Sequence, residues 1–276
     1  MSRRLARPTL AWTFVAALAA SAFGAPKSEP WLRWEAHDET TGFRVDHSAW
    51  DSFLREYVVV DHPSGIHRVR YAEVGMAGKQ ALDRYLDGLE SVAVSELGRA
   101  EQKPYWINLY NALTVKLVLM HFPAKSIRKI RISPGWFQAG PWGAKLLTVE
   151  DEEISLDDIE HRILRPLWQD NRVHYALNCA SLGCPNLQPE AFTAENTERL
   201  LGQAAREYVN HLRGARIEKG RLIVSTIYDW FRADFGGTEA GVLEHLRSHA
   251  EPPLREALAS FSGKIRYEYD WALNEQ

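Results

Sequence analysis

Cysteine is scarce in this chain, a large net charge is absent, and no apolar run is long enough to cross a bilayer comfortably. Two of the 276 residues are cysteine, and the formal net charge is -3 at neutral pH. That balance gives no electrostatic reason to expect nucleic acid as a partner. The sequence also lacks internal repeats, low-complexity tracts and linkers. We therefore expect one large domain over residues 46–276, preceded by a lead-in at 26–45.

The amino terminus has the pattern of a secretory signal rather than of a folded element. Three arginines precede a short apolar run at residues 10–20, and small residues follow that offer cleavage sites. The pattern predicts a signal peptide over residues 1–25, cut between Ala22 and Ala25. An uncleaved anchor is the alternative. We expect a periplasmic or secreted protein with no stable membrane span after cleavage, and no cysteine lies near the cleavage region to carry a lipid.

Hydrophobic periodicity predicts many helices and few strands. The predicted helices cover residues 80–97, 105–121 with Pro104 at its start, 155–166, 194–212 and 226–235, followed by two more. The predicted strands cover residues 173–178, 221–225 and 264–271. Together they indicate an α+β class, a helix-rich single domain with a small sheet. A papain-like or transglutaminase-like relation rests on analogy alone.

The side chains most capable of chemistry gather in one run, residues 174–185. It reads His174-Tyr-Ala-Leu-Asn178-Cys179-Ala-Ser181-Leu-Gly-Cys184-Pro185 and holds both cysteines. Bridged cysteines need Cα atoms roughly 4.4–6.8 Å apart, whereas five extended residues span about 16 Å. A disulfide therefore requires the loop to fold back, which a left-handed Gly183 permits. A disulfide, a free reactive thiol, metal ligation and inert packing all remain open.

Two asparagines interrupt the helix predicted at 105–121, which is apolar nearly all round and therefore buried. Asn108 and Asn111 are three residues apart and share one helix face. Buried amides need hydrogen-bond partners. They either tie down neighbouring loops, or orient a catalytic group or bind a substrate amide.

The helix predicted at 155–166 carries a carboxylate, Glu160, within its apolar stripe. Ser155 and Asp158 form a capping-box pattern at its start, and Pro166 is expected to end it. A buried carboxylate needs a partner. In the structural interpretation, His161 pairs with Asp157 on the surface and Glu160 with an arginine. In the functional one, Glu160 and His161 point into the site with shifted pKa values.

Five segments of the chain resemble the domain-of-unknown-function family 547. They are residues 105–112, 155–165, 171–185, 227–236 and 269–274, which include Tyr105-Trp-Ile-Asn-Leu-Tyr-Asn-Ala112 and Tyr269-Asp-Trp-Ala-Leu-Asn274. Their order and spacing agree with the family from about residue 50 to the end. The resemblance implies no established activity and gives no residue a role.

The leading functional hypothesis is a thiol-centred hydrolase or acyl transferase acting on peptide or amide bonds in the cell envelope. Cys179 or Cys184 would be the nucleophile, with His161 or His174 as base and Glu160 or an asparagine as the orienting group. In an extended strand, His174 would lie about 16 Å from Cys179 and face the other way. That spacing favours His161 as the partner of the thiol.

Two other hypotheses belong to different classes. One is a non-catalytic binding domain with an aromatic groove and a Cys179–Cys184 disulfide; the glycine- and tryptophan-rich loop at residues 133–143 is a candidate wall. The other is a metal site, but no Cys-x-x-Cys or His-Glu-x-x-His spacing supports it, so we expect no metal and no cofactor. The expected partner is a peptide or small-molecule ligand, and the oligomeric state stays open. The candidate substrate-binding residues are Asn108, Asn111, Asn178 and Ser181.

Overall fold

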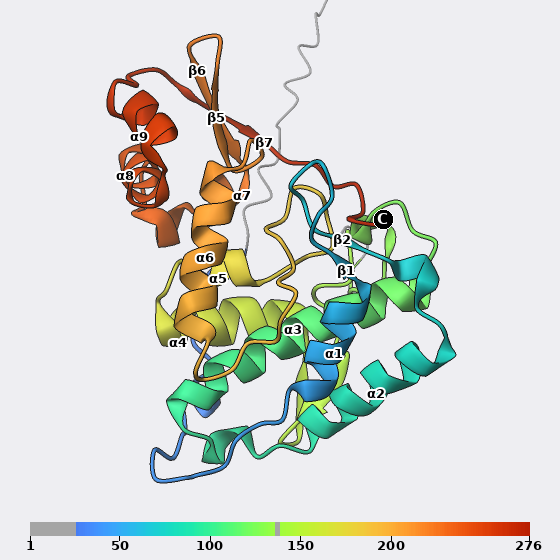
Figure 1. The fold of residues 1–276 in the computed structure, drawn as a ribbon. Coiled ribbons are helices and arrows are strands. Elements are labelled where there is room, and N and C mark those ends of the chain that lie inside the picture. The colour runs from blue at the N-terminus through green and yellow to red at the C-terminus, as the bar shows by residue number, and fades with distance from the viewer. Residues whose placement is uncertain (1–25, 136–138) are drawn as a thin grey trace, which may run out of the picture.

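Helices make up most of the regular structure in the computed structural model, which describes residues 26–135 and 139–276. The α-helices are α1 (Ser48–Tyr57), α2 (Met76–Glu90), α3 (Arg99–His121), α4 (Arg165–Trp168), α5 (Val173–Ala176), α6 (Thr197–Asn210), α7 (Ile227–Trp230), α8 (Glu239–His249) and α9 (Pro252–Ala259). Short 3₁₀ helices are η1 (Leu32–Glu35), η2 (Tyr71–Glu73), η3 (Val94–Glu96), η4 (Ile127–Lys129) and η6 (Arg232–Phe235), and η5 (Asp158–Leu164) is a π-helix. The helix-rich α+β prediction is confirmed (Figure 1).

The strands are short and form three small sheets. They are β1 (Val58–Val59), β2 (Arg68–Val69), β3 (Leu147–Val149), β4 (Glu152–Ile154), β5 (Ala215–Glu218), β6 (Arg221–Ser225) and β7 (Ile265–Glu268). β1 pairs with β2 and β3 with β4, both antiparallel, while β6 lies between an antiparallel β5 and a parallel β7. A parallel pair needs a long crossover. Helices α7, α8 and α9 supply it, so the strands predicted near 221–225 and 264–271 become neighbours.

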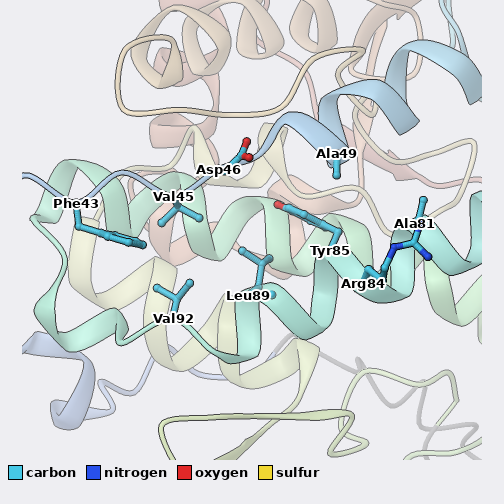
Figure 2. Close-up of a pocket in the computed structure, with 10 residues that line it drawn as sticks. Phe43, Val45, Asp46, Ala49, Ala81, Arg84, Tyr85, Leu89 and Val92 are labelled. Atoms are coloured by element: carbon cyan, nitrogen blue, oxygen red, sulfur yellow. The ribbon is translucent and has the colours of Figure 1, made fainter.

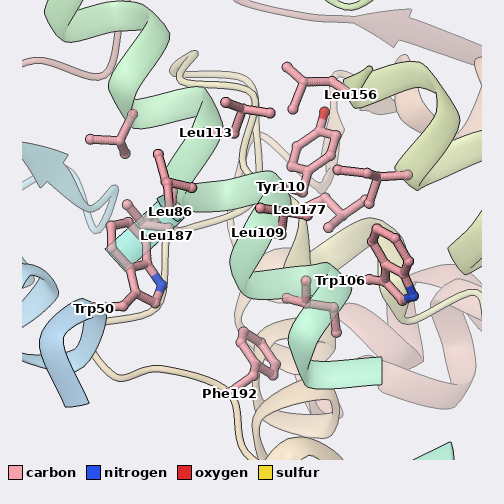
Figure 3. Packing of buried hydrophobic residues seen from close by; sticks show 14 of the residues in the cluster. Trp50, Leu86, Trp106, Leu109, Tyr110, Leu113, Leu156, Leu177, Leu187 and Phe192 are labelled. Atoms are coloured by element: carbon pink, nitrogen blue, oxygen red, sulfur yellow. The ribbon is translucent and has the colours of Figure 1, made fainter. Parts of the chain in front are cut away.

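Helix α3 runs through the larger hydrophobic core, where Trp106, Leu109 and Leu113 pack among residues from α1, α2 and the loops (Figure 3). Its burial on nearly every side agrees with its all-round apolar sequence. The predicted start at Pro104 is wrong, because the helix begins at Arg99. A proline in the second turn removes the hydrogen bond to the carbonyl four residues earlier and crowds that carbonyl, but the helix continues through it to His121.

A second hydrophobic core lies around α6, α8 and the β5–β6–β7 sheet. The run that holds the cysteines passes from one core to the other. Tyr175 packs in the second core, whereas Ala176 and Leu177 pack in the first. Residues 174–185 therefore lie where the two hydrophobic cores meet. Ligand sites are common at such junctions.

The strand predicted at residues 173–178 is wrong, because Val173–Ala176 form the short helix α5. Alternation of apolar and polar residues predicts a strand only if one face is exposed. Here all six side chains from Val173 to Asn178 are buried, so the alternation carries no information about faces. Helix α5 also removes the extended spacing that separated His174 from Cys179.

The lead-in before the domain packs against it through Trp34, which is 1% exposed and contacts Trp106 edge to face with ring centroids 5.0 Å apart. The predicted signal peptide, residues 1–25, and part of the tryptophan-rich loop, residues 136–138, lie outside the described residues. Across residues 26–135 and 139–276, no helix combines the length and the apolar character needed to cross a membrane.

Candidate active site

The loop from Asn178 to Pro185 folds back so that its two cysteines meet. The left-handed residue is Ala180, with φ of 57°, and not the expected Gly183. A non-glycine residue in this region stores strain of about 1–2 kcal/mol. Gly183 is needed for another reason: a Cβ there would lie 2.8 Å from the backbone nitrogen of Asp270.

Two asparagine side chains, those of Asn178 and Asn111, fix the start of this loop. The Asn178 side-chain oxygen accepts the N–H of Ala180 at 2.9 Å, and its amide nitrogen donates to the Pro185 carbonyl at 2.7 Å. Asn111 of α3 accepts the N–H of Asn178 and donates to the carbonyl of Ala176, both at 2.9 Å. These bonds fix the backbone just before Cys179.

The chain end completes the support of the loop. An antiparallel bridge joins Ser181 to Leu273, and a parallel bridge joins Val69 to Glu275. The N–H of Gly183 donates to the Asp270 carbonyl at 2.8 Å. Figure 1 shows this segment leaving β7 and ending beside β1 and β2. The cysteine loop is therefore built partly by residues about 90 positions later in the sequence.

The two thiols differ in exposure and acidity. Cys179 is partly exposed, Cys184 is buried, and both are free. The N–H of Cys179 donates to the Cys184 sulfur at 2.9 Å, and the Cys179 sulfur lies 3.2 Å from the Ser181 hydroxyl and 3.1 Å from the Tyr269 hydroxyl. The Cys184 thiol lowers the pKa of Cys179 against the opposing effect of burial, and Ser181 and Tyr269 lower it further. Burial raises the pKa of Cys184 well above its ordinary value. Cys179 is therefore the thiol that ionises more easily.

His174 lies between two carboxylates beside this loop. Its Nε2 is 2.8 Å from Asp234 Oδ2, and its Nδ1 faces Glu160 Oε1 at 3.5 Å. The ring stacks on Phe231 with centroids 4.0 Å apart. Burial alone would lower the pKa of His174, but Asp234 and Glu160 outweigh it and raise this pKa above its ordinary value. The arrangement favours an imidazolium held between two carboxylates.

The charge of Glu160 acts on both His174 and Cys179. Burial would raise the pKa of Glu160, but the imidazoles of His161 and His174 and the charge of Arg165 hold it below its ordinary value. The Tyr110 hydroxyl lies 3.4 Å from Glu160 Oε2. The negative charge of Glu160 also acts on Cys179, whose pKa it raises in part. A carboxylate, an imidazole and a thiol thus occupy one neighbourhood.

His161 does not pair with either sulfur, although the sequence favoured that partner. Its Nδ1 lies 3.1 Å from Arg165 Nη1, and its Nε2 lies 3.6 Å from Asp157 Oδ1. Burial lowers the pKa of His161 to about 4. Arg165 in turn donates to both oxygens of Asp234, at 2.6 and 3.2 Å. The predicted contact between His161 and Asp157 therefore exists, but His161 itself is buried.

The local fold explains why Glu160 points inward. Ser155 and Asp158 exchange hydrogen bonds at 3.1 and 2.9 Å, which confirms the predicted capping box. The helix then widens into the π-helix η5, where the N–H of Arg165 reaches the carbonyl of Glu160. π-helical turns are rare overall, and those that occur are often found at functional sites. Pro166 does not end the helix as predicted, since α4 continues to Trp168; a proline is tolerated in a first turn.

The remaining candidate residues are tied to the chain itself. Asn108 donates to the Phe192 carbonyl at 2.7 Å and accepts its N–H at 3.0 Å. The loop-tying interpretation of Asn108 and Asn111 is therefore confirmed, whereas a substrate-binding role for them or for Asn178 stays a prediction. Ser181 lies against the Cys179 sulfur and 2.9 Å from the Tyr269 hydroxyl.

Sequence reasoning missed Asp234 and Tyr269. Both lie within the segments that carry the family resemblance, residues 227–236 and 269–274. That placement was the available signal, but a motif without a known activity gives no role to its members. The contact of Tyr110 with Glu160 was missed for a different reason. An aromatic residue in an apolar helix is expected to pack in the hydrophobic core.

A separate surface groove of about 370 Å³ lies between residues 43–49 and α2 (Figure 2). Its wall is mainly apolar and includes Phe43, Tyr85 and Leu89, with Asp46 and Arg84 among its polar residues. Its lining includes neither cysteine and none of Glu160, His174, Asp234 and Tyr269. Among the described residues, no group of three or more histidine, cysteine or acidic side chains is arranged to hold a metal ion.

Comparison with known proteins gives one match. The family model described as "Protein of unknown function, DUF547" matches residues 94–209. The matched part contains α3, η5 and both cysteines, while Asp234 and Tyr269 lie after it. No curated protein and no solved structure matches the chain.

Proposed function

We propose that this chain, which is a DUF547 domain-containing protein, is a cysteine-dependent hydrolase or acyl transferase acting on peptide or amide bonds. One observation carries the proposal: of two neighbouring free thiols, Cys179 is partly exposed with a lowered pKa, while Cys184 is buried with a raised pKa. A purely structural pair of cysteines has no need of this difference, whereas a nucleophile has.

In the proposed reaction, the Cys179 sulfur attacks the carbonyl carbon of the amide and passes its proton to Glu160. A carbon–sulfur bond forms, the carbon–nitrogen bond breaks, and the proton from Glu160 leaves with the amine. Water, or an acceptor amine in the transferase, then attacks the thioester. Glu160 takes the proton of that second nucleophile and returns it to the departing sulfur.

The neighbouring groups have supporting roles in this proposal. Burial raises the pKa of Tyr269 well above its ordinary value, so its hydroxyl stays protonated 3.1 Å from the sulfur. It can donate a hydrogen bond to the oxyanion that forms there. His174, itself held by Asp234, keeps Glu160 ionised and fixes its orientation. The third residue of a catalytic triad has the same role toward the base.

The proposed location is the periplasm or the cell exterior. The arginine-rich start, short apolar run and small residues before Ala25 support export. N-terminal sequencing of the protein from a periplasmic fraction tests this. We expect the mature chain to begin at a cut between Ala22 and Ala25, and recovery of the uncut chain from the cytosol would refute export.

The test of the activity is to trap the thioester. The mature protein is mixed with a p-nitrophenyl ester, quenched in acid and measured by intact mass, with peptide mapping of the acyl group. We expect one acyl group on Cys179. Cys184→Ala should still acylate, Cys179→Ser should form no thioester, and Glu160→Gln should acylate more slowly.

The same samples test the alternative binding domain. Intact mass after alkylation, with and without reduction, shows whether Cys179 and Cys184 are bridged. Bridged cysteines in the native protein, with no acylation even after reduction, would refute the enzyme and favour the binding domain.

A further inference from the structure

Four partly exposed aromatic rings form a continuous cluster beside the thiol: Trp142, Trp230, Tyr269 and Trp271. Trp271 lies at its centre, with ring centroids 5.7 Å from Trp142, 5.4 Å from Trp230 and 4.6 Å from Tyr269. The Tyr269 hydroxyl is the atom that contacts the Cys179 sulfur. We call these four residues the aromatic cluster.

The aromatic cluster also contacts the helix that carries Glu160. The Trp142 carbonyl accepts the N–H of Asp157 at 3.0 Å, and Asp157 immediately precedes η5. Its rings pack against both hydrophobic cores, Trp142 and Trp271 on the larger one, and Trp230 and Tyr269 on the smaller. The aromatic cluster therefore borders the thiol on one side and the carboxylate helix on the other.

A basic segment adjoins the aromatic cluster. Lys125, Arg128, Lys129 and Arg131 are all exposed. Within residues 26–135 and 139–276, the ion pairs between side chains include none of them. The Arg128 guanidinium lies 5.1 Å from the centre of the Trp271 ring, and the Lys125 carbonyl accepts the N–H of Leu273 at 3.0 Å.

Acidic side chains near this segment are fewer. Asp270 and Glu275 are exposed on the C-terminal segment. The Asp270 carboxylate accepts the N–H of Ala272 at 2.9 Å, which keeps it turned toward its own backbone. Asp229 and Glu268, next to Trp230 and Tyr269, are paired with Arg232 and Arg216. The four cations of the basic segment therefore face two carboxylates that are unpaired within the described residues, which leaves a locally positive edge on a chain whose net charge is -3. Local charge of this kind attracts an anionic ligand to one place on the surface.

We propose that the aromatic cluster and the basic segment together bind the substrate of Cys179, an acidic peptide. An apolar or aromatic side chain next to the scissile amide packs on the rings of Trp230 and Trp271. Carboxylates further along the peptide meet Arg128 and the neighbouring cations. A neutral sugar could pack on the rings but would gain no affinity from the cations. The cations therefore favour an acidic peptide over a neutral sugar. This inference rests on the proposed function.

Binding is measured apart from chemistry in the mature Cys179→Ala protein. The probes are three N-acetylated, C-terminally amidated tripeptides, Phe-Glu-Glu, Phe-Gln-Gln and Phe-Lys-Lys, followed by tryptophan fluorescence. We expect the acidic peptide to bind about tenfold more tightly than the neutral one at low salt, and the difference to shrink as salt screens the charges. The basic peptide should bind most weakly.

Variants locate the binding. Arg128→Gln should weaken the acidic peptide about two- to fivefold, as expected for an exposed ion pair, and leave the neutral one unchanged. Arg206→Gln is the matched control, because Arg206 is an exposed arginine on α6. Trp271→Leu should weaken both the acidic and the neutral peptide, and circular dichroism checks that each variant is folded.

Equal affinity for the three peptides, equal effects of Arg128→Gln and Arg206→Gln, or tighter binding of an uncharged oligosaccharide would overturn the inference. The two proposals fail separately. Charge-dependent binding without thioester formation on Cys179 refutes the enzyme alone. Thioester formation without charge preference refutes the acidic-peptide site alone.

Discussion

Replacing Asn111 with alanine should destabilise the fold strongly, because this amide closes two buried hydrogen bonds around the start of the cysteine loop. Asn111 is 2% exposed, and both bonds measure 2.9 Å. The substitution leaves the Ala176 carbonyl and the Asn178 N–H buried without partners. Each unpaired group costs about 1–3 kcal/mol, so the free energy of unfolding should fall by roughly 2–6 kcal/mol.

Urea unfolding followed by tryptophan fluorescence measures this loss, provided the slope with denaturant is unchanged. Asn171→Ala is the control, since its side chain makes one long bond of 3.4 Å to the Asp234 carbonyl. It should cost less than about 1 kcal/mol. If Asn111→Ala costs no more than Asn171→Ala, the amide does not brace the loop as described.

A second comparison separates stability from the site. Asn108 is buried and makes an equivalent pair of bonds, but to Phe192. Asn108→Ala should therefore destabilise the fold by a similar amount. Only Asn111→Ala should change the alkylation rate of Cys179, because only Asn111 bonds the residue before it. Equal effects of both variants on Cys179 would contradict a local role for Asn111.

Three further predictions concern pH, charge and close packing. Burial lowers the pKa of His47 and His161 to about 4 and of His245 to about 3. Burial raises the pKa of Asp157 to about 7, which opposes this effect, but the three histidines outnumber it. The unfolded chain therefore binds more protons below pH 6.5, so the urea midpoint should fall as pH drops from 6.5 toward 4; a flat profile would contradict this. Asp234→Asn removes a carboxylate that is 20% exposed, which should cost about 2–3 kcal/mol and lower the pKa of His174 in an NMR titration. Gly183→Ala should lower the melting temperature, since its Cβ would clash with backbone, whereas Gly88→Ala, with nothing within 4 Å, should not.

The sequence predicted the long elements well because their periodic patterns reflect burial directly. Helix α6 and strand β6 lie close to their expected positions, whereas α2 ends at Glu90 rather than at residue 97 and α3 begins at Arg99 rather than after Pro104. The prediction failed in the run leading to Cys179, where every side chain is buried and alternation has no meaning. It also missed the π-helix, because one extra residue per turn leaves no trace in composition.

The grouping of side chains at the candidate site was predicted only in part, for a related reason. The sequence brought out Cys179, Glu160 and His174 as chemically capable groups in or near one run. It could not join them to Asp234 or Tyr269, since those contacts span 60 and 90 positions in the chain. Contacts of that range depend on how the two cores pack, and local spacing does not encode them.

The central claim is that Cys179 is the reactive thiol of the pair, and the pH dependence of its alkylation tests this most directly. The rate of iodoacetamide labelling at Cys179 is followed by peptide mapping in the wild type and in Cys184→Ala. The account predicts half-maximal reactivity below the ordinary cysteine pKa of about 8.5, and a higher midpoint in Cys184→Ala, because the Cys184 thiol is the main cause of the lowered pKa. A wild-type midpoint at or above about 8.5, or a Cys179 that labels only after reduction, would contradict the account.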